Sequence, residues 1–175
     1  MLAGTVEVIA RRRARVSEPF ELPAEAQAKL QIWRASRARI VFTNGVYDLL
    51  HRGHVEYLEE ARALGDRLVV GVNSDASVRR LKGPSRPIVA LADRAGLLQA
   101  LSCVDLVVTF EDDTPLRLVT AVQPDVLVKG ADYAVADIVG RDVVEARGGV
   151  VATIALRAGL STSAIIERIK AGKGV

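Results

Sequence analysis

The stretch IVFTNGVYDLLHRGHVEYLEEARALGDRLVVGV, residues 40–72, holds two short apolar runs with a helical pattern between them. The runs at 40–43 and 68–72 have the length of strands and are rich in β-branched residues. Between them, residues 55–64 predict a helix, and Gly65 follows where a helix should stop. Strand, helix and strand in this order predict parallel pairing through a right-handed crossover.

The same alternation continues to the end of the chain. Further strand-length runs lie at 106–110, 126–128 and 150–155. Helices are predicted at 75–81, 93–101, 115–121, 139–147 and 163–170. We therefore predict the α/β class, with a doubly wound five-stranded parallel sheet that has helices on both faces and binds its ligand at the carboxyl ends of the strands.

The rest of the composition fits one domain of this kind. The chain has 175 residues, of which 50% are hydrophobic but only 4% aromatic, so the core must consist of Val, Leu, Ile and Ala. We predict one folded domain at 39–175, preceded by an N-terminal extension at 1–38. The extension holds a candidate strand at 5–9, a charged run at 11–15 and a candidate helix at 24–34.

Charge and cysteine content exclude several classes. The formal net charge is +3, but residues 1–39 hold eight basic and four acidic side chains, so the body is close to neutral and we expect no nucleic-acid partner. The single cysteine, Cys103, excludes an internal disulfide and a cysteine-based zinc site. Without a signal-peptide pattern or a membrane-length apolar run, we expect a cytoplasmic protein with no membrane partner.

The junction after the first strand carries the candidate chemistry. Gly45 permits a tight turn, and Gly53 lets the backbone approach a ligand. His51 and His54, three residues apart at a helix start, point to an anion site. Two alternatives are ordinary polar loop residues and a metal site with Asp48, although no third histidine or second cysteine exists to complete tetrahedral zinc. Neither a G-x-G-x-x-G nor a P-loop pattern is present.

Residues 45–54, Gly-Val-Tyr-Asp-Leu-Leu-His-Arg-Gly-His, closely resemble the Gly-x-Phe-Asp-x-x-His-x-Gly-His signature of the cytidylyltransferase-like nucleotidyltransferases. Residues 160–163, Leu-Ser-Thr-Ser, resemble the second signature of that family, which opens its last helix. The resemblance covers about residues 38–170 and implies a Rossmann-like nucleotidyltransferase fold. Tyr47 departs from the usual Phe.

Within this superfamily, further segments resemble the adenylyltransferases that act on D-glycero-β-D-manno-heptose 1-phosphate. These segments are residues 72–75, 81–83 with 86–87, 110–115 and 128–133. The resemblance implies transfer of AMP from ATP to the sugar phosphate, giving ADP-heptose, a lipopolysaccharide precursor, and pyrophosphate. Val89 and Ala90 stand where Asn-Pro is usual, and Arg157 lies one place closer to the second signature than the family arginine.

The resemblance also implies site residues. Catalytic roles fall to His51, His54 and Lys82, and an orienting role to Asp48. Nucleotide contacts are implied for Thr43, Asn44, Gly45, Val46, Tyr47, Gly53, Asp132, Tyr133, Leu160, Ser161, Thr162 and Ser163. Candidates for sugar-phosphate binding are Arg79, Arg86 and Lys129, of which Arg79 has the alternative of a solvated helix face and Lys129 that of a solvated loop. We interpret residues 111–113 as a solvated acidic turn.

The implied cofactor is Mg²⁺, held mainly by the ATP phosphates, with no metal site on the protein. Implied partners are ATP, a sugar 1-phosphate, a separate heptose kinase that supplies it, and a second copy in a homodimer. Two alternatives remain: a cytidylyltransferase for glycerol 3-phosphate or a related small alcohol phosphate, and a nucleotide-binding module without catalysis.

Overall fold

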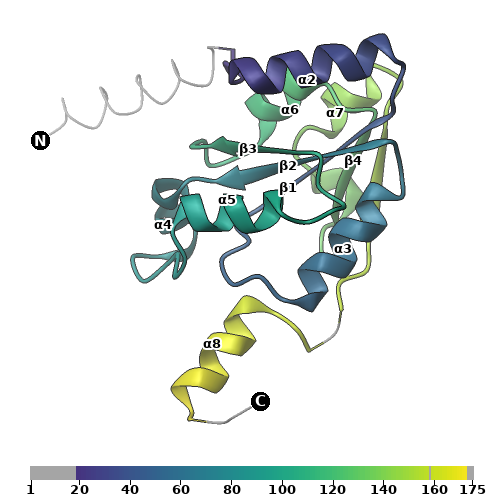
Figure 1. Ribbon diagram of the computed structural model, residues 1–175. Coiled ribbons are helices and arrows are strands. Elements are labelled where there is room, and N and C mark those ends of the chain that lie inside the picture. The colour runs from purple at the N-terminus through teal and green to yellow at the C-terminus, as the bar shows by residue number, and fades with distance from the viewer. Residues whose placement is uncertain (1–18, 158, 173–175) are drawn as a thin grey trace, which may run out of the picture.

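Five parallel strands form the centre of the computed structural model, which describes residues 19–157 and 159–172 (Figure 1). The strands are β1 (Ile40–Gly45), β2 (Arg67–Asn73), β3 (Leu106–Phe110), β4 (Val126–Gly130) and β5 (Val150–Ile154). Their order is β3-β2-β1-β4-β5, and every neighbouring pair is parallel. The predicted α/β doubly wound five-stranded sheet is confirmed.

Helices connect the strands at the predicted places, with ends that differ by no more than three residues from the predicted ones. They are α2 (Ala24–Ala35), α3 (Arg52–Arg62), α4 (Asp75–Lys82), α5 (Leu91–Gln99), α6 (Leu116–Val122), α7 (Arg141–Glu145) and α8 (Thr162–Lys170). A short 3-10 helix, η1 (Val135–Asp137), precedes α7. No helix in the described part of the chain is long and apolar enough to cross a bilayer.

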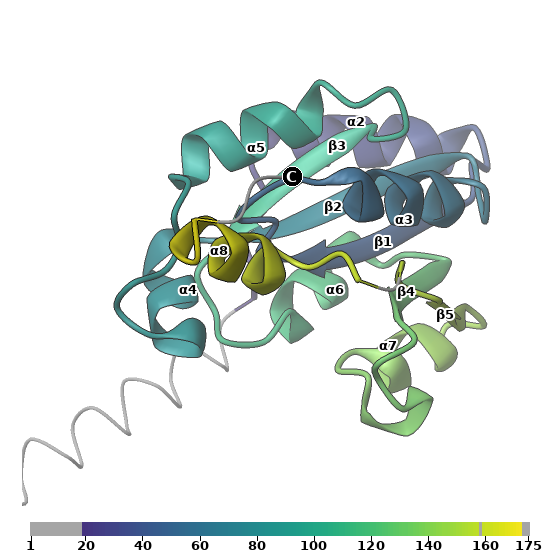
Figure 2. The same ribbon diagram turned by 90° about the horizontal axis from the view of Figure 1, so that it is seen from below.

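Strand alternation divides the core into two layers. On β1, Ile40 and Phe42 face α2, α6 and α7, whereas Val41 faces α3 and α5. Figure 1 shows the first set of helices above the sheet, and Figure 2, seen from below, shows α3 and α5 on the near side. The sheet therefore carries helices on both faces.

The helix before β1 belongs to this packing. Ala26 and Leu30 on α2 are buried in the same cluster as Phe42. The candidate strand at 5–9 and the charged run at 11–15 lie outside the described residues. The division between residues 38 and 39 stays a prediction.

Aspartates close the amino edge of the sheet. The residues that directly precede β2, β3 and β4 are Asp66, Asp105 and Asp125, and each accepts a backbone N–H from a neighbouring strand or its lead-in. The bonds run from Arg39 N to Asp66 (2.7 Å), Ile40 N to Asp125 (2.7 Å) and Leu68 N to Asp105 (2.8 Å). These carboxylates satisfy backbone groups that the parallel ladder leaves open at the strand starts.

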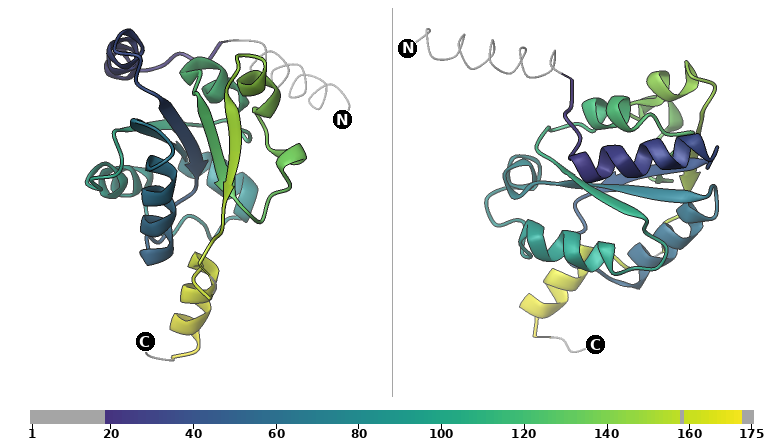
Figure 3. Two further views of the ribbon diagram at one scale, coloured as in Figure 1. Left: turned by 90° about the vertical axis from the view of Figure 1, so that its right-hand side faces the viewer. Right: turned by 45° about the horizontal axis from the view of Figure 1, so that its top comes forward.

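The last helix stands beyond the opposite edge. In Figures 1 and 3, α8 projects past the carboxyl ends of the strands, and none of its residues is buried. Ser161 caps the helix by accepting a hydrogen bond from Ala164 N (3.1 Å). The fold thus brings a helix N-terminus to the edge where a parallel sheet binds its ligands.

Candidate active site

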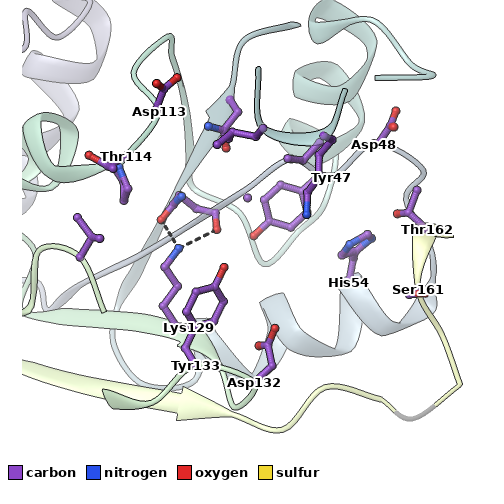
Figure 4. A pocket seen from close by; sticks show the side chains of 18 of the residues that line it. Tyr47, Asp48, His54, Asp113, Thr114, Lys129, Asp132, Tyr133, Ser161 and Thr162 are labelled. Atoms are coloured by element: carbon purple, nitrogen blue, oxygen red, sulfur yellow. Dashed lines mark hydrogen bonds between the residues drawn. The ribbon is translucent and has the colours of Figure 1, made fainter. Parts of the chain in front are cut away.

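A cavity of about 580 Å³ opens at the carboxyl edge of the sheet (Figure 4). It lies where the loops after β1, β3 and β4 meet the start of α8, the position that doubly wound sheets use for ligands. Most residues predicted for the site line it: Asn44, Gly45, Val46, Tyr47, Asp48, His54, Lys82, Arg86, Lys129, Asp132, Tyr133, Ser161, Thr162 and Ser163.

Two stacked histidines form one wall. His51 is the extended N-cap residue of α3 and His54 lies in its first turn, so their ring centroids are 3.8 Å apart at an interplanar angle of 17°. Both Nδ1 atoms are buried and have no hydrogen-bond partner in the described chain. Because His54 lines the cavity with Nδ1 sealed away, Nε2 is the nitrogen that can reach a ligand.

The surroundings keep this pair uncharged. Burial, together with the neighbouring His51, lowers the pKa of His54 to about 4. Burial also lowers the pKa of His51. Both rings are therefore neutral near pH 7 in the free protein, and each has one N–H to donate.

The two glycines of the first signature make room for these rings. A Cβ on Gly53 would lie 3.2 Å from the His51 ring, and one on Gly45 would lie 3.0 Å from the ring of Tyr47. Tyr47 itself is buried at a φ of 50° and meets His54 edge-on, with centroids 5.2 Å apart. The unusual tyrosine thus packs as an aromatic side wall of the histidine site.

Asp48 fixes the loop that follows α4. It is buried, forms an ion pair with Arg86, and accepts the backbone N–H groups of Ile88 (2.7 Å) and Val89 (2.9 Å). The orienting role predicted for Asp48 thus has a visible target, the loop between Lys82 and α5. Arg86 reaches the cavity already paired with this carboxylate.

A buried arginine that the sequence interpretation did not include ties the same region together. Arg94 on α5 is 1% exposed and pairs with Asp75 at the start of α4 (2.7 Å). It also donates to the carbonyl oxygens of Val46 (2.6 Å), Asn73 (2.9 Å) and Val89 (3.0 Å). Its only sequence signal is a basic residue at a position of α5 that the helical pattern turns towards the core.

Lys129 at the end of β4 forms the centre of the cavity floor. Its Nζ donates to Asn44 Oδ1 (2.6 Å) and lies 5.6 Å from the Tyr133 ring centroid. Burial lowers the pKa of Lys129 to about 8, and Asp132 acts in the opposite direction. Figure 4 shows this lysine between the His54 side of the cavity and the Thr114 side.

The second signature closes the side next to the histidines. Thr162 Oγ1 donates to Leu49 O (3.4 Å), which ties the start of α8 to the first signature. Arg157 bonds Glu56 on α3 (2.6 Å) and does not line the cavity. Ser161, Thr162 and Ser163 are the residues of this segment that do.

Five predicted residues lie outside the lining: Thr43, His51, Gly53, Leu160 and Arg79. Thr43 is buried and its Oγ1 lies 2.7 Å from Tyr57 Oη, while His51 stacks behind His54. Eight lining residues were not predicted: Asn73, Leu81, Asp113, Thr114, Pro115, Asp137, Ile138 and Val139. They come from the end of β2, the end of α4 and the segments after β3 and β4, which only the strand order brings together.

Two of the four carboxylates that line the cavity are held in ion pairs. Asp48 pairs with Arg86 and Asp113 pairs with Arg80. No group of three His, Cys, Asp or Glu side chains within residues 19–157 and 159–172 is placed to hold a metal ion. The donor set suits phosphate oxygens better than a cation held by the protein.

Comparison with known proteins places this site in a family. The cytidylyltransferase-like family pattern matches residues 42–168. The bifunctional protein HldE of Magnetococcus marinus is 57% identical over 150 residues, 85% of this chain and 31% of that protein. HldE of Syntrophotalea carbinolica is 51% identical over 163 residues, 93% of this chain and 33% of that protein, so the chain spans about a third of these relatives.

A solved structure agrees in fold. The lipopolysaccharide core biosynthesis protein from Thermoplasma volcanium superposes with a TM-score of 0.57 at 31% identity, covering 69% of this chain and 97% of that one. The family pattern, which matches residues 42–168, runs from β1 into α8 and therefore includes both signatures and the cavity between them. This chain belongs to the cytidylyltransferase-like family of nucleotidyltransferases.

Proposed function

We propose that the chain is an adenylyltransferase that moves AMP from ATP to D-glycero-β-D-manno-heptose 1-phosphate, giving ADP-heptose and pyrophosphate. The observation that carries the proposal is that His54 and Ser161–Thr162, from two distant signatures, line one cavity. Similarity to bifunctional HldE proteins and to a lipopolysaccharide core biosynthesis protein supports the sugar substrate.

The reaction needs placement and charge rather than a protein nucleophile. A phosphate oxygen of the sugar 1-phosphate attacks the α-phosphorus of ATP and forms the new P–O bond. The bond from the α-phosphorus to the bridging oxygen breaks, and its electron pair leaves with pyrophosphate. The protein holds both phosphates in line and stabilises the charge that develops between them.

His54 supplies a donor at this point. His54, neutral and with Nδ1 buried, donates its Nε2–H to an oxygen of the α-phosphate. The donor role that the resemblance implies for His51 is not part of the proposal, because His51 stacks behind His54 outside the cavity lining. A prepositioned donor of this kind is worth on the order of 3 kcal/mol of barrier. The ring of His51 also holds that of His54 by stacking.

The other lining groups take the remaining parts of the two substrates. Ser161 and Thr162 at the start of α8 serve the β- and γ-phosphates, since a helix N-terminus attracts anions. Asp132 and Tyr133 serve the ribose and the base. Lys82 screens the repulsion between the two anionic substrates, and Lys129 binds the phosphate of the acceptor. Mg²⁺ enters with ATP, held mainly by the phosphate oxygens.

The direct test is pyrophosphate release with a panel of substrates. We expect release with ATP and the heptose phosphate together, and none with either alone. Consumption of CTP with glycerol 3-phosphate, without consumption of ATP, would replace the proposal by the cytidylyltransferase alternative. Nucleotide binding without release for any acceptor would favour a non-catalytic module.

The surroundings of the enzyme are part of the proposal. A kinase that phosphorylates the anomeric hydroxyl of the heptose must supply the acceptor. We further propose a cytoplasmic homodimer, which sedimentation of the purified chain tests directly. A monomer at micromolar concentration would remove the homodimer and leave the chemistry unchanged.

A further inference from the structure

One end of the cavity holds polar side chains to which the proposed function assigns no part of the nucleotide: Asn73 and Thr114, together with Asn44, for which the family resemblance implied a nucleotide contact. Residues two apart on a strand share a face, so Asn44 lies on the face of Phe42, and Lys129 on the face of Leu127. Asn73 ends β2 on that same face, two residues after Gly71, the register partner of Asn44. His54, in contrast, enters from α3 on the other face. The cavity therefore straddles the sheet edge, and we call the part of it that Asn44, Asn73 and Thr114 line the chamber.

Hydrogen bonding fixes what the two amides present to this chamber. The Lys129 ammonium can only donate, so Asn44 accepts through Oδ1 and keeps its Nδ2 protons free. The single proton of Ser77 Oγ goes to the carbonyl of Asp112 (3.1 Å), so Ser77 accepts from Asn73 Nδ2 (3.0 Å). Asn73 Oδ1 is left without a partner among the described residues.

That oxygen opens on the chamber. Only the two histidine Nδ1 atoms are both sealed from solvent and unpartnered among the residues the structure describes. Asn73 lines the cavity, so its Oδ1 is accessible there. Asn44 near the end of β1 thus offers the chamber an amide donor, and Asn73 at the end of β2 offers it an amide acceptor.

Thr114 adds a hydroxyl from the opposite wall. It lines the cavity, and its Oγ1 makes no hydrogen bond within the described residues. Residues 137–139 complete this wall. An amide donor, an amide acceptor and a hydroxyl, all neutral, match a polyol, because each sugar hydroxyl both donates and accepts.

We propose that this chamber binds the hydroxyl groups of the acceptor sugar, and that Asn44, Asn73 and Thr114 determine its specificity. The inference rests on the proposed function, since it assigns the end of the same cavity that holds the acceptor. It predicts preference for a polyhydroxylated sugar phosphate over glycerol 3-phosphate. Each side chain that hydrogen bonds a sugar hydroxyl should lower the KM for the acceptor and leave the KM for ATP unchanged.

Thr114→Val is the first test, because it removes the hydroxyl and keeps the shape. We expect the KM for the heptose 1-phosphate to rise about three- to tenfold while the KM for ATP stays within twofold. The matched control is Thr120→Val on the exposed side of α6, where the hydroxyl bonds Leu116 O (2.8 Å) outside the cavity. Equal acceptor KM values for Thr114→Val and wild type would overturn the assignment of Thr114.

A substitution of Asn73 also removes its hydrogen bond to Ser77, so its effect on the local structure must be separated from its effect on acceptor binding. Ser77→Ala removes the same bond between Asn73 and Ser77, and the bond from Ser77 to Asp112 as well, but leaves the Asn73 oxygen in place. We expect Asn73→Ala to raise the acceptor KM at least threefold more than Ser77→Ala does. Equal effects of the two variants would show that Asn73 acts only through the loop, and would overturn its role in specificity.

A binding experiment separates this inference from the reaction. Calorimetric titration of each variant with the heptose 1-phosphate, and separately with glycerol 3-phosphate, needs no turnover. Weaker sugar binding by Thr114→Val and Asn73→Ala supports the chamber even if wild type releases no pyrophosphate. Turnover by wild type with unchanged sugar binding in both variants overturns the chamber and leaves the proposed function standing.

Discussion

The aspartates at the amino edge of the sheet are hydrogen bonded to neighbouring strands, whereas at the carboxyl edge two buried histidine nitrogens have no partner among the described residues. At the amino edge, Asp105 accepts Leu68 N and pairs with Arg62. At the carboxyl edge, the Nδ1 atoms of His51 and His54 are buried and unpartnered. Unpartnered buried polar groups lower stability, so their concentration at one edge marks a place where the fold gives up stability to hold the His54 ring with its Nε2 towards the cavity.

The histidine side should show the largest effect, and it should be an effect on rate. We expect His54→Ala to lower kcat about 10²- to 10³-fold, because it removes a donor to the transition state. The free energy of unfolding should change by about 1 kcal/mol or less, since the lost ring carries an unpartnered nitrogen. Steady-state pyrophosphate release and urea unfolding of the same preparation measure both quantities. A folded variant with near wild-type kcat would contradict the mechanism.

The amino edge should respond in the opposite way. Asp105→Ala removes the acceptor of Leu68 N and the partner of Arg62, and we expect a loss of about 2 kcal/mol in urea unfolding. Both KM values should stay within twofold at a temperature where the variant is folded. Asp105→Asn keeps an oxygen for Leu68 N and should lose less. A tenfold change in either KM would break the division between the two edges.

Much of this contrast was readable in the sequence. The β-branched runs predicted all five strands, and the glycines and histidines of residues 45–54 predicted the strand end at which the cavity opens. The amino-edge aspartates also have a signal in the sequence, because Asp105 and Asp125 directly precede apolar runs and Asp66 precedes one by two residues. Local pattern was sufficient wherever an interaction lies within one β–α–β unit.

The remaining features depend on segments that are distant in the sequence. Arg94 binds carbonyl oxygens of two loops and of the last residue of β2. Thr114 reaches the cavity because α6 packs on the face opposite α3. Neither position has a residue type that marks it. Arg86 is the converse case: its charge suggested a phosphate contact, and the structure pairs it with Asp48, which its position in the sequence does not reveal.

Lys129 combines the features of the two edges, because it is hydrogen bonded to Asn44 and yet lines the cavity. With a pKa of about 8 lowered by burial, it is charged below pH 8 and loses its charge above. We expect kcat/KM for the acceptor to fall by up to tenfold per pH unit above 8, since the free enzyme's pKa governs this parameter. Lys129→Arg should remove this fall, because a guanidinium stays charged. An unchanged alkaline fall in Lys129→Arg would assign it to another group.

The smallest effect is expected from Arg79, and its value lies in its contrast with Lys82 three residues on. Both are basic residues in the last turn of α4, but Lys82 lines the cavity and Arg79 does not. We therefore expect Arg79→Ala to change the acceptor KM less than twofold, because an exposed charge outside the cavity is screened by solvent. Lys82→Ala serves as the positive reference in the same assay. If Arg79→Ala raised the acceptor KM as much as Lys82→Ala, charge across the whole helix face, rather than position at the carboxyl edge, would control acceptor binding.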